Sequence, residues 1–339
     1  MEEISFAVDC MGGDYAPLEI VRGCILAAEQ LGHRILLVGD GEEIEKILKK
    51  AGRLNDPLLQ IVHAPESIGM DEPPSSVLRK KNSSLYTAAR LVREGSAEGL
   101  ISAGNTGAVL AVGKFIVGVE EEVERPAIAV ALPNPRGKTV LIDVGANVDS
   151  KPKHLVQFAV IGHTYAEEIL GVRNPRIGLL SIGEEEGKGN ELVRETYPLL
   201  KQTGLNFAGN AEGRDIYAGT FDVIVCDGFI GNVILKASES LGMAVVQMIK
   251  EEVKRSVIAR LGAFLLMPAL ARFKKKADFA EYGGIPLLGA RKPVIITHGR
   301  ANAKAIKNAV KVATDFLHTD FNRKLVENMK RLIPEGVKV

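Results

Sequence analysis

The sequence predicts an α/β protein in which a mostly parallel sheet lies between two layers of helices, a three-layer α/β/α arrangement. Short apolar runs alternate with longer segments of helical periodicity along the whole chain, as repeated βαβ units require. The short runs are apolar throughout, which is typical of strands buried on both faces. With 339 residues and 46% hydrophobic content the chain can bury a full core. We expect one domain over residues 1–339, with a division into two lobes left open.

Nine apolar runs are the predicted strands. In chain order they are residues 4–8, 35–38, 59–62, 99–102, 127–131, 139–143, 177–181, 222–226 and 294–297. Helical periodicity is clear at residues 20–31, 42–51, 192–203, 233–248 and 303–316. Ligands of such folds bind at the carboxyl ends of the strands, beside the N-termini of the following helices.

Composition excludes several classes of protein. Lys plus Arg total 43 against 42 for Asp plus Glu, so the net charge gives no reason to expect nucleic acid binding. The three cysteines Cys10, Cys24 and Cys226 are too scattered for a disulfide framework or a thiolate metal site. The N-terminus lacks a secretory signal, and no apolar run approaches the roughly 20 residues of a membrane-spanning helix. We expect a cytoplasmic protein.

Glycine and asparagine recur where a predicted strand meets a predicted helix. The stretches are "SAGNTG" at residues 102–107, "DGFIGN" at 227–232 and "HGRAN" at 298–302. Helix starts expose unpaired N–H groups and the positive end of the helix dipole, and glycine lets an anion approach them closely. Each stretch alone is more typical of an ordinary turn and cap. Together they predict a pocket for an anion the size of phosphate.

The familiar nucleotide and hydrolase motifs fail when their spacing is checked. The stretch that begins at Gly39 lacks the third glycine of a dinucleotide-binding turn. Residues 183–190 resemble a P-loop but are one residue short and lack the Ser or Thr that would hold Mg²⁺. No G-x-S-x-G elbow is present. An ATPase, a dinucleotide-fold dehydrogenase and a serine hydrolase are therefore disfavoured.

Seven stretches in order make the chain resemble the bacterial phosphate acyltransferases of phospholipid synthesis, the PlsX family. They are "AVDCMGGDYAP", "SAGNTGA", "LIDVGAN", "SIGEEEGKGN", "GNAEGRD", "VCDGFIGNVILK" and "HGRANAKAI". The resemblance implies a fold similar to the phosphate acetyltransferase and isocitrate/isopropylmalate dehydrogenase group. It also implies transfer of a long-chain acyl group from acyl carrier protein to inorganic phosphate, with no cofactor. The acyl phosphate product would feed a membrane glycerol-3-phosphate acyltransferase, and the enzyme would be a homodimer at the inner face of the cell membrane.

That reaction needs a phosphate site, a polarised thioester carbonyl and a proton for the departing thiol, and a positioned anion needs no covalent intermediate. The candidate catalytic residues are His298, Asn105 and Asp227. The candidate phosphate-binding residues are Gly104, Thr106, Gly107, Gly228, Asn232, Arg214, Arg300 and Asn302. His298 would protonate the leaving thiol or else have a purely structural role.

Two other chemistries are weaker alternatives at these strand ends. Cys10 and Cys226 lie at the ends of apolar runs, where cysteine is usually a small buried hydrophobe rather than a nucleophile. The strand-end carboxylates could hold Mg²⁺, but no fixed ligand spacing supports a metal; they are Asp9, Asp14, Asp143 and Asp227. We therefore expect no metal.

Residues 254–276 differ in character from the rest of the chain. They contain seven Lys or Arg and no acidic residue. We expect a protruding amphipathic helical hairpin with a bend at Pro268. The candidate membrane contacts are Leu261, Phe264, Leu265 and Leu266. Packing in a dimer and docking of the acidic carrier protein remain open as alternatives.

Two further functions compete with the acyltransferase interpretation. A binding protein could use the same turns to sequester an anionic metabolite. A decarboxylating dehydrogenase of similar fold would bind its cofactor without the usual dinucleotide turn, so the missing motif argues against it only weakly. Thiol release that depends on phosphate would separate these functions.

Overall fold

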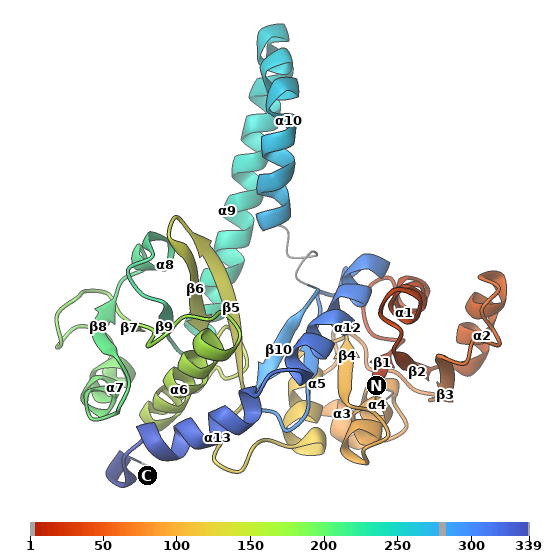
Figure 1. The fold of residues 1–339 in the computed structure, drawn as a ribbon, viewed down its shortest axis with the longest axis horizontal. Coiled ribbons are helices and arrows are strands. Elements are labelled where there is room, and N and C mark those ends of the chain that lie inside the picture. The colour runs from red at the N-terminus through yellow and green to blue at the C-terminus, as the bar shows by residue number, and fades with distance from the viewer. Residues whose placement is uncertain (1–3, 278–282, 338–339) are drawn as a thin grey trace.

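The computed structural model describes residues 4–277 and 283–337, and one sheet forms the centre of the molecule (Figure 1). The strand order is β3-β2-β1-β4-β11-β10-β5-β6-β9-β7-β8. The strands are β1 (Ser5–Asp9), β2 (Arg34–Gly39), β3 (Leu59–His63), β4 (Gly99–Ser102), β5 (Ala127–Asn134), β6 (Gly137–Ile142), β7 (Ile177–Leu180), β8 (Phe207–Ala211), β9 (Val223–Val225), β10 (Ile285–Leu288) and β11 (Val294–Ile296). All nine predicted strands are present, and the predicted fold class is confirmed.

The sheet consists of two parallel halves joined by antiparallel pairs. Strands β3, β2, β1, β4 and β11 are mutually parallel, as are β6, β9, β7 and β8. Between the halves, the pairs β11–β10, β10–β5 and β5–β6 are all antiparallel. Three reversals make β6 run opposite to β11. The carboxyl ends of the two halves therefore do not share one edge of the sheet, so the turn at residues 227–232 lies apart from the turns at residues 102–107 and 298–302.

Strands β8 and β10 are absent from the sequence prediction for identifiable reasons. Gly209 and Asn210 interrupt β8, which lies at the outer edge of the sheet. Gly284 and Pro286 give the region of β10 a sequence that is typical of a turn. Both residue types are typical of loops, and only pairing with a neighbouring strand overrides that preference.

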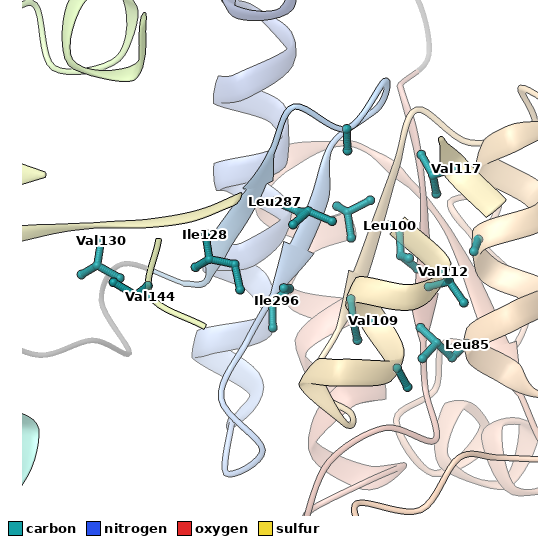
Figure 2. Close-up of a cluster of buried hydrophobic side chains, with 14 of the residues drawn as sticks. Leu85, Leu100, Val109, Val112, Val117, Ile128, Val130, Val144, Leu287 and Ile296 are labelled. Carbon is teal, nitrogen blue, oxygen red and sulfur yellow. The ribbon is translucent and has the colours of Figure 1, made fainter. Parts of the chain in front are cut away.

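Helices cover both faces of the sheet. They are α1 (Leu18–Leu31), α2 (Gly41–Lys50), α3 (Ser76–Arg79), α4 (Ser84–Arg93), α5 (Thr106–Val112) with the π-helical turn Gly113–Val117, α6 (Pro152–Glu168), α7 (Glu191–Lys201), α8 (Asp215–Ala218), α9 (Gly228–Arg255), α10 (Val257–Ala277), α12 (Ala303–Leu317) and α13 (Phe321–Leu332). On β4, Leu100 packs toward α4 and α5, whereas Ile101 packs toward α1 and α12. Figure 2 shows the first of these clusters, in which Val109 and Val112 of α5 lie beside Leu100.

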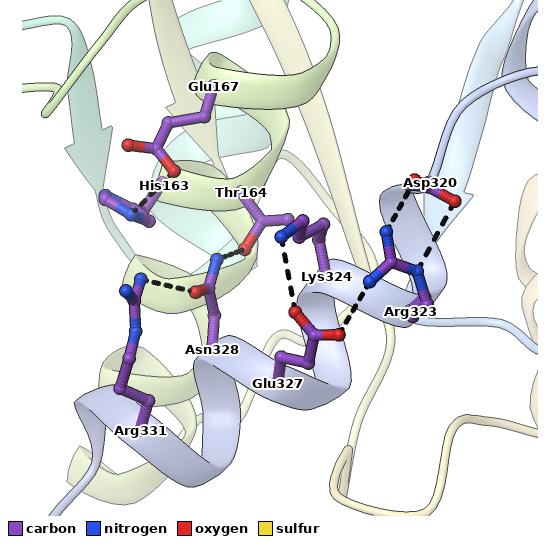
Figure 3. Close-up of polar contacts among 9 residues, drawn as sticks. All are labelled: His163, Thr164, Glu167, Asp320, Arg323, Lys324, Glu327, Asn328 and Arg331. Atoms are coloured by element: carbon purple, nitrogen blue, oxygen red, sulfur yellow. Dashed lines mark hydrogen bonds and ion pairs between the residues drawn. The ribbon is translucent and has the colours of Figure 1, made fainter.

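The C-terminal helix α13 is fixed to α6 by polar contacts (Figure 3). Asn328 Nδ2 donates a buried hydrogen bond of 3.1 Å to Thr164 Oγ1. Asn328 Oδ1 in turn accepts 2.8 Å from Arg331. On α6, His163 Nε2 lies 3.2 Å from Glu167. A satisfied buried amide of this kind fixes the register of two helices that apolar packing alone would leave less specified.

Helices α9 and α10 form a long antiparallel pair that rises from the body of the protein (Figure 1). This corrects the predicted hairpin at residues 254–276, because the chain reverses at Ser256 and α10 continues through Pro268 without a break. By length and hydropathy alone α9 could cross a membrane, with a mean hydropathy of 1.3 over 18 residues. Lys236 and Glu239 divide its sequence into shorter apolar runs.

Candidate functional site

The carboxyl ends of β1 and β4 meet in a buried polar corner, which we call the Gly104 corner after the turn that it holds. Ser102 Oγ donates a 2.8 Å hydrogen bond to Asp9 Oδ2 and accepts the N–H of Gly104 at 3.0 Å. Asp9 and Ser102 are 2% and 1% exposed. Burial raises the pKa of Asp9 above its ordinary value, although hydrogen bonds to its carboxylate oppose that shift. Asp9 therefore fixes the position of the Gly104 turn through Ser102.

Asn105 connects this corner to the segment at residues 69–74. Its Oδ1 accepts the N–H of Ala108 at 3.1 Å and so caps α5. Its Nδ2 donates to the carbonyl oxygens of Glu72 at 2.9 Å and Met70 at 3.1 Å. The side chain thus uses both its acceptor and its donors within the protein. Its role is to hold the segment against the start of α5.

Two glycines are required by close packing around the same corner. A Cβ on Gly12 would lie 2.6 Å from Asp9 Oδ2 and 2.8 Å from Gly104 N. A Cβ on Gly107 would lie 2.5 Å from Cγ of Pro74. Close contacts with neighbouring protein atoms therefore explain why these two positions are glycine. The N–H groups of Thr106 and Gly107 have no partner among residues 4–277 and 283–337, so they are available to an anion.

The turn after β11 adds a cation and an imidazole to this corner. The carbonyl of Gly299 accepts the N–H of Asp14 at 2.7 Å, which joins the turn to the segment after β1. His298 is exposed, and its Nδ1 accepts the N–H of Arg300 at 3.1 Å. This bond leaves Nε2 to carry the proton of the neutral ring, so Nε2 is a donor. Arg300 is 76% exposed and lies 3.7 Å from Asp14, which leaves most of its guanidinium for a ligand.

Asp227, Gly228 and Asn232 lie in a second group with the turn after β6. Asp227 caps α9 by accepting the N–H of Ile230 at 3.0 Å. The N–H of Gly228 donates to the carbonyl of Asn147 at 2.9 Å. A Cβ on Gly145 would lie 3.5 Å from Asn232. Within the described ranges no hydrogen bond or ion pair joins this group to the Gly104 corner.

A buried carboxylate organises that second group. Asp143 accepts the N–H groups of Ala146 at 3.0 Å and Asn147 at 2.7 Å, together with Asn147 Nδ2 at 3.0 Å. Burial raises the pKa of Asp143, and these donors oppose the shift. Amides that point at Asp143 are not free for phosphate. The turn therefore shapes the start of α9 rather than offering its own N–H groups.

The side chains of Asn302 and Arg214 already have partners within the protein. Asn302 Oδ1 caps α12 through Ala305, and Glu19 accepts the neighbouring N–H of Ala303 at 3.0 Å. That N–H and Arg22 hold the pKa of Glu19 below its ordinary value, so a carboxylate of the protein already occupies this helix start. Arg214 pairs with Glu184 at 2.7 Å and Glu212 at 3.3 Å. These acidic partners compete with any phosphate at Arg214.

The cysteines are poorly suited to nucleophilic chemistry. Cys10, Cys24 and Cys226 are all buried. Burial raises the pKa of the Cys10 and Cys226 thiols well above the ordinary value, which suppresses the reactive thiolate. In the part of the chain that the structure describes, no group of three His, Cys, Asp or Glu side chains is arranged to hold a metal ion.

Sequence reasoning missed two parts of the Gly104 corner. Ser102 was part of a predicted strand, and no local pattern shows that its hydroxyl bridges Asp9 and Gly104. The segment at residues 69–74, "GMDEPP", precedes a short helix and carries no strand or helix period. Its dense turn residues were a signal for a loop. Its contact with Asn105 depends on tertiary structure alone.

Solved structures of other proteins share this fold. A phosphotransacetylase from Streptococcus pyogenes aligns with a TM-score of 0.62 at 17% identity, over 93% of this chain and 94% of that one. A branched-chain phosphotransacylase from Enterococcus faecalis V583 aligns with a TM-score of 0.55 at 15% identity, over 93% and 99%. The chain therefore has the α/β fold of the phosphotransacetylases. Its Gly104 corner lies at the carboxyl ends of β1 and β4.

Sequence relatives identify the family. The model of a family described as "Fatty acid synthesis protein" matches residues 4–324. A "Phosphate acyltransferase" of Aquifex aeolicus is 81% identical over 99% of this chain and the whole of that protein. One of Pelotomaculum thermopropionicum is 51% identical over 99% of this chain and 96% of its own length. The chain belongs to this family of phosphate acyltransferases, and it is an enzyme.

Proposed function

We propose that the protein transfers a long-chain acyl group from acyl carrier protein to inorganic phosphate, producing acyl phosphate for phospholipid synthesis. Full-length identity of 81% to a relative named phosphate acyltransferase carries this proposal. The family description, fatty acid synthesis, supports a fatty acyl donor. The acyl carrier protein as donor and the role in phospholipid synthesis are proposed here in addition to the family assignment.

The Gly104 corner supplies groups that suit this reaction. The unpartnered N–H groups of Thr106 and Gly107 and the guanidinium of Arg300 would bind the phosphate oxygens. Because Asp9, Ser102 and Asn105 fix the backbone around them, these donors need little reorganisation when charge develops. Positioning and electrostatic stabilisation are then the main sources of rate.

The chemical step is a direct acyl transfer. A phosphate oxygen attacks the thioester carbonyl carbon, and an oxyanion forms at the carbonyl oxygen. The C–S bond then breaks, the new C–O bond to phosphate remains, and the thiolate takes up a proton. The proton that the thiolate takes up is the one that the attacking hydrogen phosphate releases. His298 Nε2–H is the proposed hydrogen-bond donor to the departing sulfur, since Nδ1 already accepts the N–H of Arg300. Asp227, Gly228 and Asn232 belong to the other group and are not part of this proposed phosphate site.

The paired helices α9 and α10 are proposed as the contact with the membrane surface and with a second copy of the chain. Leu261, Phe264, Leu265 and Leu266 are 57–73% exposed in a single chain, which leaves a large apolar surface to be covered. Side chains of the basic residues 272 and 274–276 lie outside the described part. A peripheral enzyme there would release an insoluble acyl phosphate to a membrane glycerol-3-phosphate acyltransferase.

The test is thiol release from long-chain acyl-acyl carrier protein by the purified chain, with and without inorganic phosphate. We expect release only with phosphate, together with a stoichiometric acyl phosphate product that hydroxylamine traps. Release that is independent of phosphate would contradict the proposal and indicate a hydrolase. Binding of phosphate with no release would indicate a protein that only sequesters the anion.

A further inference from the structure

A basic hollow lies at the end of the outermost strand of the first half-sheet. It has a volume of about 330 Å³ and is lined by residues from the end of β3, from α4 and from the turn before α4. Its polar lining includes His63, Lys81, Asn82, Tyr86 and Arg90. None of the residues that line it is acidic. This composition favours an anionic ligand.

The cationic groups of the hollow are not neutralised by the protein. Neither Lys81 nor Arg90 has an ion-pair partner among the described residues. His63 Nδ1 accepts the N–H of Gly41 at 3.1 Å, which leaves Nε2 to carry the proton of the neutral ring. The hollow therefore offers a guanidinium, an ammonium and an imidazole N–H, a set that suits the oxygens of a phosphate ester.

The hollow and the Gly104 corner lie at the same edge of the sheet. Strands β3, β2, β1 and β4 are parallel neighbours, so their carboxyl ends point the same way. Three strand spacings separate β3 from β4, which is about 14 Å. One segment also joins the two places: Lys80 pairs with Glu72 at 2.8 Å beside Asn105, and the next residue, Lys81, lines the hollow.

We infer that this hollow binds the phosphate ester at the far end of the thioester donor's arm. Acyl carrier thioesters are carried on a flexible organic chain whose other end is a phosphodiester. Anchoring the phosphate in the hollow would leave the chain to run along the sheet edge and place the thioester near Thr106 and Arg300. The inference rests on the proposed function, because it assigns a subsite to the proposed donor. At 330 Å³ the hollow is larger than a bare phosphate needs.

The experiment measures binding to the full chain without turnover, by ligand-observed NMR with 4′-phosphopantetheine, pantetheine and inorganic phosphate. We expect 4′-phosphopantetheine to bind at least about tenfold more tightly than pantetheine, since charge-assisted hydrogen bonds are lost with the phosphate. The double variant Lys81→Ala/Arg90→Ala should remove this difference. Arg93→Ala is the matched control, because Arg93 is an exposed cation on the same helix that does not line the hollow.

Three results would overturn the inference: equal binding of 4′-phosphopantetheine and pantetheine, no effect of the double variant, or inorganic phosphate binding equally well through Lys81 and Arg90. The last would make the hollow a site for the free anion. In the phosphate-dependent thiol release assay, the double variant should raise the KM for the carrier thioester about tenfold or more with little change in kcat. If the unaltered protein shows no such release, the proposed function fails while the binding result still decides the subsite.

Discussion

Asn105 Nδ2 lies 2.9 Å from the carbonyl oxygen of Glu72, while Oδ1 of the same amide lies 3.1 Å from the N–H of Ala108. One side chain therefore caps α5 and holds the segment at residues 69–74 over the helix start. This arrangement makes Asn105 a positioning residue whose loss affects both the cap and the neighbouring segment. Its two functions can be separated by substitution.

Asn105→Ala should lower acyl phosphate production and destabilise the fold by about 1–2 kcal/mol, because a cap is lost. Asn105→Asp keeps the acceptor for Ala108 but removes the donors to residues 70 and 72. Its second carboxylate oxygen would face the carbonyl oxygens of Met70 and Glu72, so we expect Asn105→Asp to show faster hydrogen exchange at residues 69–74 and lower turnover. Normal exchange and normal turnover in Asn105→Asp would show that the connection to Glu72 is unimportant.

Gly107→Ala should destabilise the protein by about 1–3 kcal/mol, since the new methyl group would overlap the Pro74 ring. Thermal unfolding and phosphate-dependent turnover measure the effect. Gly213→Ala is the control, because no heavy atom lies within 4 Å of a Cβ at that position. Equal melting temperatures for the two variants would mean that residues 69–74 move away at little cost.

Arg300→Gln should raise the KM for phosphate about tenfold or more, because a charge-assisted contact is lost. Arg214→Gln should change that KM much less, since Glu184 and Glu212 already pair with the Arg214 guanidinium. Steady-state kinetics with varied phosphate separate the two arginines. A larger effect at Arg214 than at Arg300 would move the phosphate site to the β7–β8 end of the sheet.

Leu265→Glu tests the surface of α10, where Leu265 is 73% exposed. Loss of binding to anionic vesicles with an unchanged oligomeric state would support membrane contact. Dissociation of the oligomer, measured by light scattering, would instead assign the surface to packing between copies. Gln30→Glu is the control, because it adds the same charge at an exposed position of α1, outside the α9–α10 pair. If Leu265→Glu lowers turnover of the carrier thioester but changes neither vesicle binding nor the oligomeric state, the carrier protein docks on α10.

Protonation of Glu124 at low pH should destabilise the protein. Lys153 at 2.8 Å and His154 at 3.1 Å lower the pKa of Glu124 from its ordinary 4.5 to about 2. A carboxyl with a lowered pKa contributes stability above pH 4.5 and loses it as the pH falls toward 2. Burial also lowers the pKa of His154, so protonation of that ring adds to the loss below its ordinary 6.5.

Glu124→Gln should therefore flatten the fall in the free energy of unfolding below pH 4.5, measured by urea denaturation. Solvent screening of the half-exposed pair limits the change to about 1 kcal/mol. Glu121→Gln, at an exposed position nearby, should leave the pH profile unaltered. A profile for Glu124→Gln that matches the unaltered protein would exclude a stabilising role for the Lys153 contact.

The sequence by itself determined the α/β class, the nine strands and the glycine turns at the strand ends. Those features depend on local periodicity, backbone freedom and capping, which neighbouring residues along the chain specify. The resemblance to the phosphate acyltransferases likewise followed from motifs in order, and the relatives confirm it.

Tertiary structure alone decided which turns meet. The three antiparallel pairs β11–β10, β10–β5 and β5–β6 make β6 run opposite to β11, so the Gly104 and Gly228 turns belong to different groups. The hydrogen bond between Ser102 and Asp9 joins residues that are far apart in the chain, and one hollow is lined both by His63 and by Lys81 and Arg90. Their juxtaposition is set by strand order and packing of the whole sheet, which no short window of sequence encodes.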